Sequence, residues 1–262
     1  MENIMLSKPH KVVKIMKETQ AEYTFRVEYT GEAKHGQFFM LSIPKVGEAP
    51  ISVSGKGDDY VEFTIRKVGR LTEGIFGLAP GENLFMRGPY GNAFPVEEFK
   101  NKDLLVICGG TGMAPVRTTL NYFYNHPDVC KSVNLIAGFK DLNSVLFTDE
   151  LEKWKSRFNT WYCLDNMEAD GFHKGFVTEY IKEVPISSFE DYNIVIVGPP
   201  AMMRFSAQEC IKNGAELEKI WVSFERKMSC AVGKCGHCKI NETYVCLEGP
   251  VFNYTVAKDL LD

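Results

Sequence analysis

Four cysteines near the C-terminus form the group of residues with the clearest chemistry. Cys230, Cys235, Cys238 and Cys246 follow the spacing C-x4-C-x2-C-x7-C, with glycines between the first three. Several thiols on so short a loop are typical of a metal centre. The opening x4-then-x2 spacing is known for [2Fe–2S] clusters, where glycine lets the backbone approach the sulfides closely. The pattern therefore predicts that these four cysteines ligate one [2Fe–2S] cluster.

Structural zinc is the main alternative, because four cysteines also suit a tetrahedral Zn²⁺ ion. Zinc sites usually pair two CxxC knuckles, whereas only Cys235 and Cys238 form one here. Disulfides are the least favoured interpretation, since we expect a reducing environment. The remaining four cysteines are scattered, and we expect them to be small buried side chains: Cys108, Cys130, Cys163 and Cys210.

Composition limits the classes of function. The chain has 262 residues, 45% of them hydrophobic, and a formal net charge of −4. This length predicts two globular domains, and the charge gives no reason to expect a nucleic-acid partner. No apolar run approaches the roughly 20 residues that span a bilayer, and the N-terminal residues are too charged for a signal peptide. We therefore expect a cytoplasmic protein without membrane insertion.

A glycine-rich turn in the middle of the chain has the chemistry of a phosphate site. The continuous apolar run Asp103–Cys108 predicts a buried parallel strand, and Val116–Asn125 predicts a helix. The GGTGMAP turn between them lets the backbone approach a pyrophosphate at a helix start. A tight connection without a ligand is the alternative. The candidate nucleotide contacts here are Gly109, Gly110, Thr111, Gly112, Ala114 and Pro115.

Strands and helices continue to alternate after this turn, which predicts an α/β domain with a parallel sheet. Further strands are expected at Val133–Gly138, Asn159–Leu164, Asn193–Val197 and Glu218–Phe224, and further helices at Thr148–Arg157, Phe176–Glu183 and Ala201–Asn213. Ligands of such sheets bind at the carboxyl ends of the strands. We expect Gly138–Lys140 and Asp165 at that edge, together with a second candidate loop formed by Gly198, Pro199 and Pro200. For Asp165, a solvated turn residue is the alternative.

The first hundred residues have a different pattern. Short alternating runs separated by glycine and proline turns predict a small antiparallel barrel. The runs are His10–Met16, Glu22–Tyr29, Phe38–Ile43, Ile51–Ser54, Tyr60–Val68 and Asn83–Arg87, with a helix at Leu71–Leu78. A glycine turn and a hydroxyl at Gly69 and Thr72 precede that helix, which is an arrangement that favours an anion. A turn with a helix cap is the simpler interpretation.

Taken together, these stretches resemble the ferredoxin-reductase superfamily, whose barrel holds a flavin and whose α/β domain holds a nicotinamide nucleotide. The cysteine loop narrows the resemblance to the branch that includes dihydroorotate dehydrogenase electron-transfer subunits and hydrogenase gamma subunits. Within it, the chain is most similar to the B subunits of anaerobic sulfite reductases. The stretches that carry the resemblance are VGEAPISVS (46–54), GGTGMAP (109–115), VGPPAMM (197–203), FERKMSCAVGKCGHCKI (224–240) and YVCLEGPVFNY (244–254).

The resemblance implies FAD rather than FMN, and three segments: an FAD-binding barrel (1–98), an NAD-binding domain (99–224) and a [2Fe–2S] segment (225–262). Where the superfamily commonly has Arg-x-aromatic-Ser, this chain has Ala49, Ile51 and Ser52. Other residues must then neutralise the charge of the flavin phosphates, and the candidates are Arg66 and the turn after it. The implied flavin contacts are Pro50, Ile51, Ser52, Val53, Arg66, Val68, Gly69 and Thr72.

These cofactors would work as one relay. A nicotinamide gives up two electrons together as a hydride, whereas a cluster accepts a single electron. A flavin between them can accept the pair and release the electrons one at a time. No acid or base is needed, so no catalytic side chain is predicted, and the roles of Glu225 and His237 stay open. NADH is preferred over NADPH because Lys140 is the only cation after its strand and Asp141 balances it.

The resemblance also implies partner subunits. The sequence has no second cysteine cluster that could serve a sirohaem, so we expect iron–sulfur and sirohaem subunits of a sulfite reductase complex to complete the reduction of sulfite to sulfide. Two alternatives remain. The chain could serve a dihydroorotate dehydrogenase or a hydrogenase with the same chemistry, or it could be a zinc-stabilised nucleotide-binding regulator without redox turnover.

Overall fold

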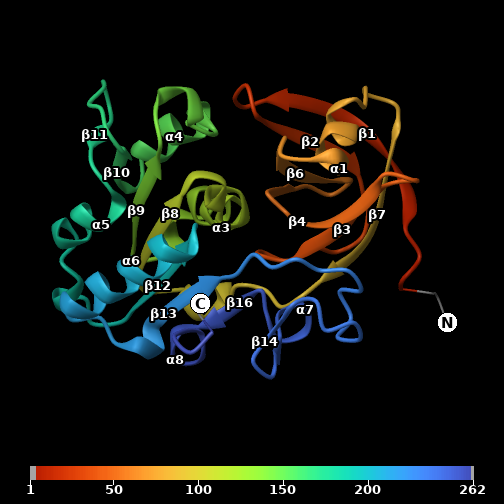
Figure 1. The fold of residues 1–262 in the computed structure, drawn as a ribbon. Coiled ribbons are helices and arrows are strands. Elements are labelled where there is room, and N and C mark those ends of the chain that lie inside the picture. The colour runs from red at the N-terminus through yellow and green to blue at the C-terminus, as the bar shows by residue number, and fades with distance from the viewer. Residues whose placement is uncertain (1–3, 261–262) are drawn as a thin grey trace. The chain divides into compact units, whose positions relative to one another are not determined.

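The computed structural model describes residues 4–260. Contacts within the chain divide it into two units. The first combines residues 1–93 with 225–250, and the second combines residues 94–224 with 251–262. In Figure 1 the colour follows residue number, so the parts of each unit can be found by their colours. The three predicted segments, with boundaries at 98 and 224, stay a prediction about domains.

The first unit is built on a seven-stranded antiparallel sheet in the order β4-β3-β7-β1-β2-β6-β5, which confirms the predicted barrel. Alternating apolar residues put Phe25, Phe39, Phe63 and Leu84 into its core with almost no exposure. Its strands and first helix are β1 (Lys8–Lys17), β2 (Glu22–Glu28), β3 (Phe38–Ile43), β4 (Gly47–Ser52), β5 (Gly55–Lys56), β6 (Tyr60–Arg66), α1 (Arg70–Phe76) and β7 (Asn83–Tyr90).

Strand β7 contains an irregularity in its pairing with β3. Phe38 lies opposite Tyr90, whereas Met40 lies opposite Arg87, so β7 carries one more residue than β3 over this stretch. In a regular strand, residues three positions apart point to opposite faces. The extra residue shifts this alternation and turns Arg87 and Tyr90 toward each other.

The same unit includes the cysteine-rich segment. This segment contains the small sheet β14 (Lys239–Ile240) with β15 (Thr243–Tyr244), and the helix α7 (Val245–Glu248). Two hydrogen bonds from Asn92, in the loop that follows β7, fix this segment to the barrel. The Asn92 backbone N–H donates to the Gly249 carbonyl at 2.7 Å, and its side-chain amide donates to the Glu248 carbonyl at 2.9 Å.

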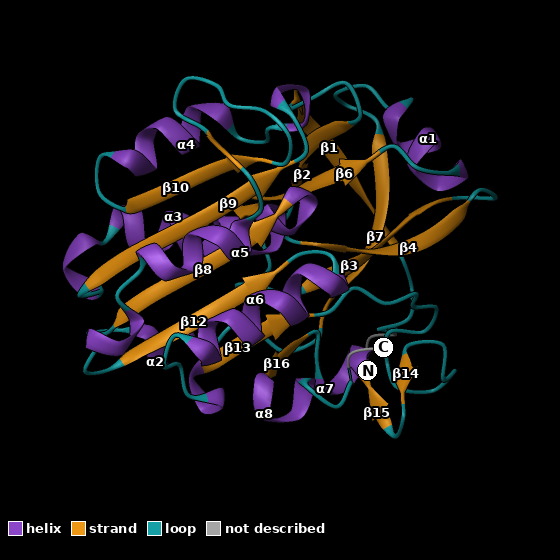
Figure 2. Ribbon diagram, turned by 60° about the vertical axis from the view of Figure 1, so that its left-hand side comes forward, coloured by secondary structure: helices purple, strands orange, loops and turns teal. Residues whose placement is uncertain are grey.

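The second unit contains a seven-stranded sheet in the order β11-β10-β9-β8-β12-β13-β16, parallel except for β16. This arrangement confirms the predicted α/β fold. Figure 2 shows the sheet with its helices. The elements are α2 (Val96–Phe99), β8 (Asp103–Gly109), α3 (Met113–Asn125), β9 (Ser132–Phe139), α4 (Thr148–Lys155), β10 (Asn159–Leu164), β11 (His173–Lys174), α5 (Val177–Tyr180), β12 (Tyr192–Val197), α6 (Pro200–Lys212), β13 (Ile220–Ser223), β16 (Val251–Asn253) and α8 (Tyr254–Ala257).

The central strands are buried on both faces, as their continuous apolar runs predicted. All residues of β8 and β12 are buried. Leu104, Val106 and Cys108 of β8 share one core cluster with buried residues of α3 and α4. Since side chains of a strand alternate between faces, Leu105 and Ile107 point to the opposite face. No helix among residues 4–260 is both long and apolar enough to cross a bilayer.

Several predicted ends were wrong. The strand expected at Ile51–Ser54 begins at Gly47 and stops at Ser52, because the Ser54 N–H turns to bond the Glu62 carbonyl at 2.8 Å. The helix expected at Phe176–Glu183 is α-helical only to Tyr180 and continues as a 3₁₀ turn. Strand β16 was not predicted. It pairs antiparallel with β13, so the chain returns to the second unit at Val251.

Candidate functional site

A pocket of about 590 Å³ lies at the carboxyl ends of the parallel strands in the second unit. Ligands of α/β sheets bind at this edge. Strands β8, β9 and β10 deliver residues to it directly or in the turn that follows each strand. The lining residues are Gly109, Gly110, Gly138, Phe139, Lys140, Asp165, Phe176, Val177, Thr178, Pro199, Ala201, Met202 and Phe205.

Gly110 is the residue of the GGTGMAP turn that leaves room for a ligand. Its φ is +54°, and a Cβ built there would have no atom within 4 Å. Gly112 has a different role, because a Cβ on it would come within 2.4 Å of the Val197 carbonyl oxygen. The turn is therefore pressed against β12 at Gly112 and open at Gly110, which is what close approach of a phosphate requires.

The predicted nucleotide residues fall into two groups. Gly109, Gly110 and Pro199 line the pocket. The others lie next to it along the chain without being among its lining residues, and three of them are buried in the turn and the first residues of α3. The second group is Thr111, Gly112, Ala114, Pro115, Gly198 and Pro200. Their contact with a nucleotide stays a prediction.

Sequence reasoning missed the apolar wall of the pocket. Met202 of α6 lies against Gly109 and Gly198, whose missing side chains make room for its sulfur. Phe176 and Phe205 line the pocket and remain 57% and 51% exposed. Large exposed aromatic side chains at the rim of a pocket suit the face of a planar ring. From the sequence, these residues were expected only as members of the helices at Phe176–Glu183 and Ala201–Asn213.

Two charged residues define the electrostatics of the pocket. Asp165 follows β10 and Lys140 follows β9, and both line the cavity. Partial burial raises the pKa of the Asp165 carboxyl above its ordinary value of 3.8, while the nearby Lys140 opposes that rise. The predicted strand-end position of Asp165 is thus observed, and the pocket carries one charge of each sign from these two residues.

The cysteine loop directs backbone N–H groups at two of its sulfur atoms. The Cys230 sulfur accepts from the N–H groups of Val232, Lys234 and Cys235 at 3.2 to 3.4 Å, and Gly233 N–H points at the Cys246 sulfur at 3.3 Å. Such a nest of N–H groups favours a negatively charged sulfur. The positive φ of Gly233 (+69°) helps to turn the backbone inward.

The four thiols of the loop differ in exposure. Cys230, Cys238 and Cys246 are buried, and Cys235 is exposed. Hydrogen bonds from the backbone at His237 and at Cys230 lower the pKa of the exposed Cys235 to about 7. Burial raises the pKa of Cys246 to about 12. Among residues 4–260, no group of three or more His, Cys, Asp or Glu side chains is arranged to hold a metal ion.

The predicted flavin residues lie on two neighbouring parts of the barrel. Pro50, Ile51 and Ser52 are half-buried on β4, and Val53 is buried just after it. Arg66, Val68, Gly69 and Thr72 surround the start of α1. Strands β4 and β6 contact each other, which brings the two parts close within the unit.

The expected anion site at α1 is largely satisfied by its own side chains. Thr72 Oγ1 accepts hydrogen bonds from the N–H groups of Val68 and Gly69 at 2.9 and 3.0 Å, so it caps the helix. Arg66 forms an ion pair with Glu22 at 3.1 Å and keeps a 60% exposed side chain. A role of these residues in flavin binding stays a prediction.

Two family models match separate parts of the chain. Residues 106–208 match the family model described as an oxidoreductase NAD-binding domain. Residues 225–256 match the iron–sulfur cluster binding domain of dihydroorotate dehydrogenase B. The sulfhydrogenase 1 subunit gamma of Pyrococcus furiosus is 35% identical over 263 residues, an alignment that covers 93% of this chain and 89% of that protein.

A second relative widens the family. A probable electron transfer subunit of dihydroorotate dehydrogenase B (NAD(+)) from Methanocaldococcus jannaschii is 34% identical, over 92% of this chain and 88% of that protein. The chain belongs to this family of electron-transfer subunits. It is therefore an oxidoreductase subunit with an NAD-binding domain and an iron–sulfur cluster binding segment.

Solved structures place the fold of this electron-transfer subunit in the ferredoxin-reductase-like class. A structure of an NADH-dependent reduced ferredoxin-NADP oxidoreductase superposes with a TM-score of 0.79 at 21% identity, over 94% of this chain and 88% of that chain. The fold expected from the sequence is thus confirmed. The B-subunit identity and the sulfite-reducing partner are finer than these relatives show, and they stay predictions.

Proposed function

We propose that this electron-transfer subunit oxidises NADH at the pocket of its second unit and passes electrons through FAD and a [2Fe–2S] cluster to partner subunits. The observation that carries the proposal is the cysteine loop. It supplies four cysteines within one short segment, and four backbone N–H groups point at two of their sulfurs. A two-iron cluster takes two thiolates on each iron, so four cysteines match the number of ligands it needs.

The residues of the nucleotide pocket fit a dinucleotide. Gly110 leaves an open approach to the start of α3, where a pyrophosphate would accept hydrogen bonds from backbone N–H groups. Phe176 and Phe205 offer apolar rims for the rings. Asp165 brings a carboxylate to the site, which disfavours the additional 2′-phosphate of NADPH through like-charge repulsion. These features support NADH as the donor.

The barrel residues fit a flavin less completely. A bound flavin supplies the conversion between the two-electron chemistry of a hydride and the one-electron chemistry of a cluster. Ile51 on β4 offers apolar cover, and Ser52 offers a hydroxyl. With Ala49 in place of an arginine, the cation predicted for the phosphate is Arg66, which must exchange or share its partner Glu22 to meet it.

The acceptor is proposed from the relatives. The names of the two relatives point to a hydrogenase or to a dihydroorotate dehydrogenase as the enzyme that this subunit serves. A sulfite reductase remains the second candidate, favoured by the resemblance of the segments 224–240 and 244–254 to the B subunits of anaerobic sulfite reductases. All three acceptors require the same electron input from this chain.

Spectroscopy, metal analysis and kinetics test the proposal together. Anaerobically purified protein should contain FAD and equal amounts of iron and acid-labile sulfide, and it should reduce an artificial dye faster with NADH than with NADPH. Stoichiometric zinc without iron would refute the cluster. Electron delivery to purified hydrogenase, dihydroorotate dehydrogenase or sulfite reductase subunits would then identify the acceptor, since the chain alone should leave hydrogen, orotate and sulfite unchanged.

A further inference from the structure

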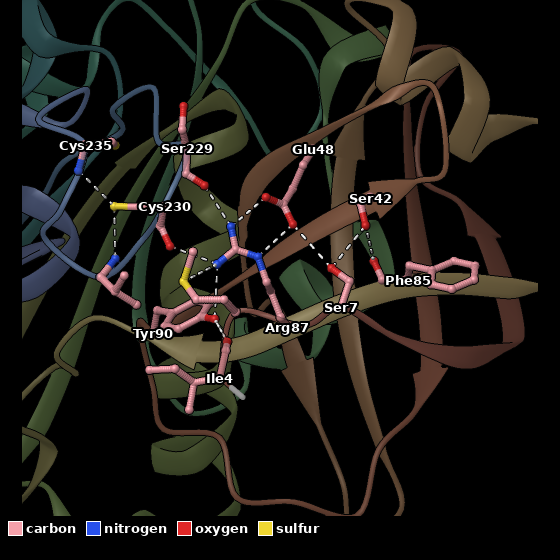
Figure 3. Close-up of polar contacts among 12 residues, drawn as sticks. Ile4, Ser7, Ser42, Glu48, Phe85, Arg87, Tyr90, Ser229, Cys230 and Cys235 are labelled. Carbon is pink, nitrogen blue, oxygen red and sulfur yellow. Dashed lines mark hydrogen bonds and ion pairs between the residues drawn. The ribbon is translucent and has the colours of Figure 1, made fainter. Parts of the chain in front are cut away.

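Arg87 is a buried arginine of β7 whose side chain reaches the cysteine loop. The residue is only 6% exposed, and its guanidinium lies within the first unit. Its Nη1 donates to the Cys230 carbonyl at 2.8 Å, and its Nη2 donates to the Ser229 carbonyl at 2.7 Å. Figure 3 shows the guanidinium between the barrel and this loop. Two consecutive carbonyls next to the first cysteine are therefore fixed by one side chain.

The opposite side of the guanidinium is fixed just as firmly. Glu48 of β4 accepts from Arg87 Nε at 2.8 Å and from Nη2 at 2.6 Å, which is a bidentate pair. Tyr90 Oη lies 3.2 Å from Nη1, and the Tyr90 hydroxyl donates to the Ile4 carbonyl. Contacts with the barrel therefore hold the planar guanidinium in one orientation, and in that orientation it bonds the two loop carbonyls, as the labelled residues in Figure 3 show.

This anchoring acts where the loop turns toward sulfur. Cys230 is the residue whose sulfur accepts three backbone N–H groups, from Val232, Lys234 and Cys235. Fixing the carbonyls of Ser229 and Cys230 sets the peptide planes that start this turn. A shift of those planes would move the three N–H groups away from the sulfur and lengthen the hydrogen bonds that orient it.

We propose that Arg87 is a positioning residue for the iron–sulfur site, because its guanidinium ties the backbone of the first cysteine ligand to the flavin-type barrel. This inference rests on the proposed cluster. Neither the cysteine spacing nor the family match assigns the role, and it depends on the fork geometry of arginine. A lysine at the same position keeps a positive charge but cannot bond two carbonyls and a carboxylate in one plane.

The test compares Arg87→Met, Arg87→Lys and a matched control, Arg26→Met. Arg26, on β2 of the same unit, pairs with one carboxylate oxygen of Glu62, through Nε at 2.9 Å and Nη2 at 2.7 Å. Each protein is purified with its cluster and treated with an iron chelator, and loss of the cluster absorption is followed. Both Arg87 variants should lose the cluster about tenfold faster than wild type, as expected for a residue that supports metal ligands. The control should match wild type.

Two further readouts separate positioning from general destabilisation. Hydrogen exchange of the apoproteins should be faster at Val232, Lys234 and Cys235 in the Arg87 variants and unchanged there in Arg26→Met. The reduction potential of the cluster should become more negative in Arg87→Met, since N–H···S bonds and nearby positive charge stabilise the reduced state. If Arg87→Met does not fold, Arg87→Lys and Glu48→Gln provide the same measurements.

The outcomes are distinct. Wild-type protein without iron and sulfide would overturn the proposed function and this inference with it. A second outcome would overturn this inference but leave the proposed function intact. In that outcome the wild-type protein contains the cluster, and the Arg87 variants match the Arg26→Met control both in the rate of cluster loss and in amide exchange. Full rescue by Arg87→Lys would also overturn it, because charge rather than the fixed fork would then be sufficient.

Discussion

The open space at Gly110 makes a strong prediction about nucleotide binding. In Gly110→Val, the new Cβ meets no atom within 4 Å, so the protein itself has room for it. The cost to folding comes from the φ of +54°, which is roughly 1–2 kcal/mol for a residue with a side chain. Because typical domains are stable by about 5–15 kcal/mol, the variant should fold. Its melting temperature should fall by about 2–8 °C.

The effect on NADH should be larger than this loss of stability suggests. The valine side chain would occupy the space that the pyrophosphate needs, so we expect kcat/KM for NADH with an artificial acceptor to fall at least about tenfold, or roughly 1.4 kcal/mol. Flavin and iron content should remain at wild-type values. Steady-state kinetics, flavin release and iron analysis measure all three quantities on the same preparation.

Gly214→Val is the control for backbone strain. Gly214 also has a positive φ, +95°, lies in the second unit, and does not line the pocket; a Cβ there would make ordinary contact with Ser187. It should lower stability without changing NADH kinetics. If Gly110→Val folds, loses stability as expected and oxidises NADH normally, the nucleotide does not bind at this turn and the reasoning is refuted.

Other predictions concern the cluster and the pocket charges. Cys235→Ser should abolish or markedly shift the cluster's electron paramagnetic resonance signal with flavin retained, whereas Cys130→Ser, outside the loop, should not; equal spectra would exclude Cys235 as a ligand. Asp165→Asn should raise the NADPH-to-NADH ratio of kcat/KM about tenfold, and Lys140→Met should lower it; unchanged ratios would remove both residues from nucleotide selection. Because burial raises the pKa of Asp165, its charged form destabilises the fold. Asp165→Asn should therefore be the more stable protein in urea at pH 7, with the difference vanishing as pH falls below 3.8; a constant difference would contradict this.

The sequence predicted those features that depend on local pattern. The continuous apolar runs at Asp103–Cys108 and Asn193–Val197 correspond to β8 and β12, because a strand buried on both faces needs apolar residues at every position. The glycine turn after β8 was located for the same kind of reason. The positive φ of Gly110 is a backbone conformation that glycine adopts readily, so glycine marks this turn in the sequence.

Features that depend on contacts between distant segments were not predictable in this way. The sequence shows Arg87 only as a cation before a glycine–proline turn, and its partner carbonyls at Ser229 and Cys230 lie more than a hundred residues later. The aromatic rim of the pocket was missed for a similar reason. Phe176 precedes α5 and Phe205 lies on α6, so the two rings come from segments that are distant in the sequence.

The return of the chain through β16 explains how a cluster segment can be added to a nucleotide-binding fold. Ser223 at the end of β13 pairs with Val251 at the start of β16, so residues 225–250 leave and re-enter the sheet at neighbouring positions. The pairing of β13 with β16 closes the long loop formed by residues 225–250. The entropic cost of closing such a loop rises only slowly with its length. The segment itself is ordered by different contacts, from Arg87 and Asn92 of the barrel. Strand pairing thus closes the loop, and contacts with barrel residues order the segment within it. The cysteine spacing could therefore be recognised from the sequence, while the residues that hold the loop in place could be found only in the structure.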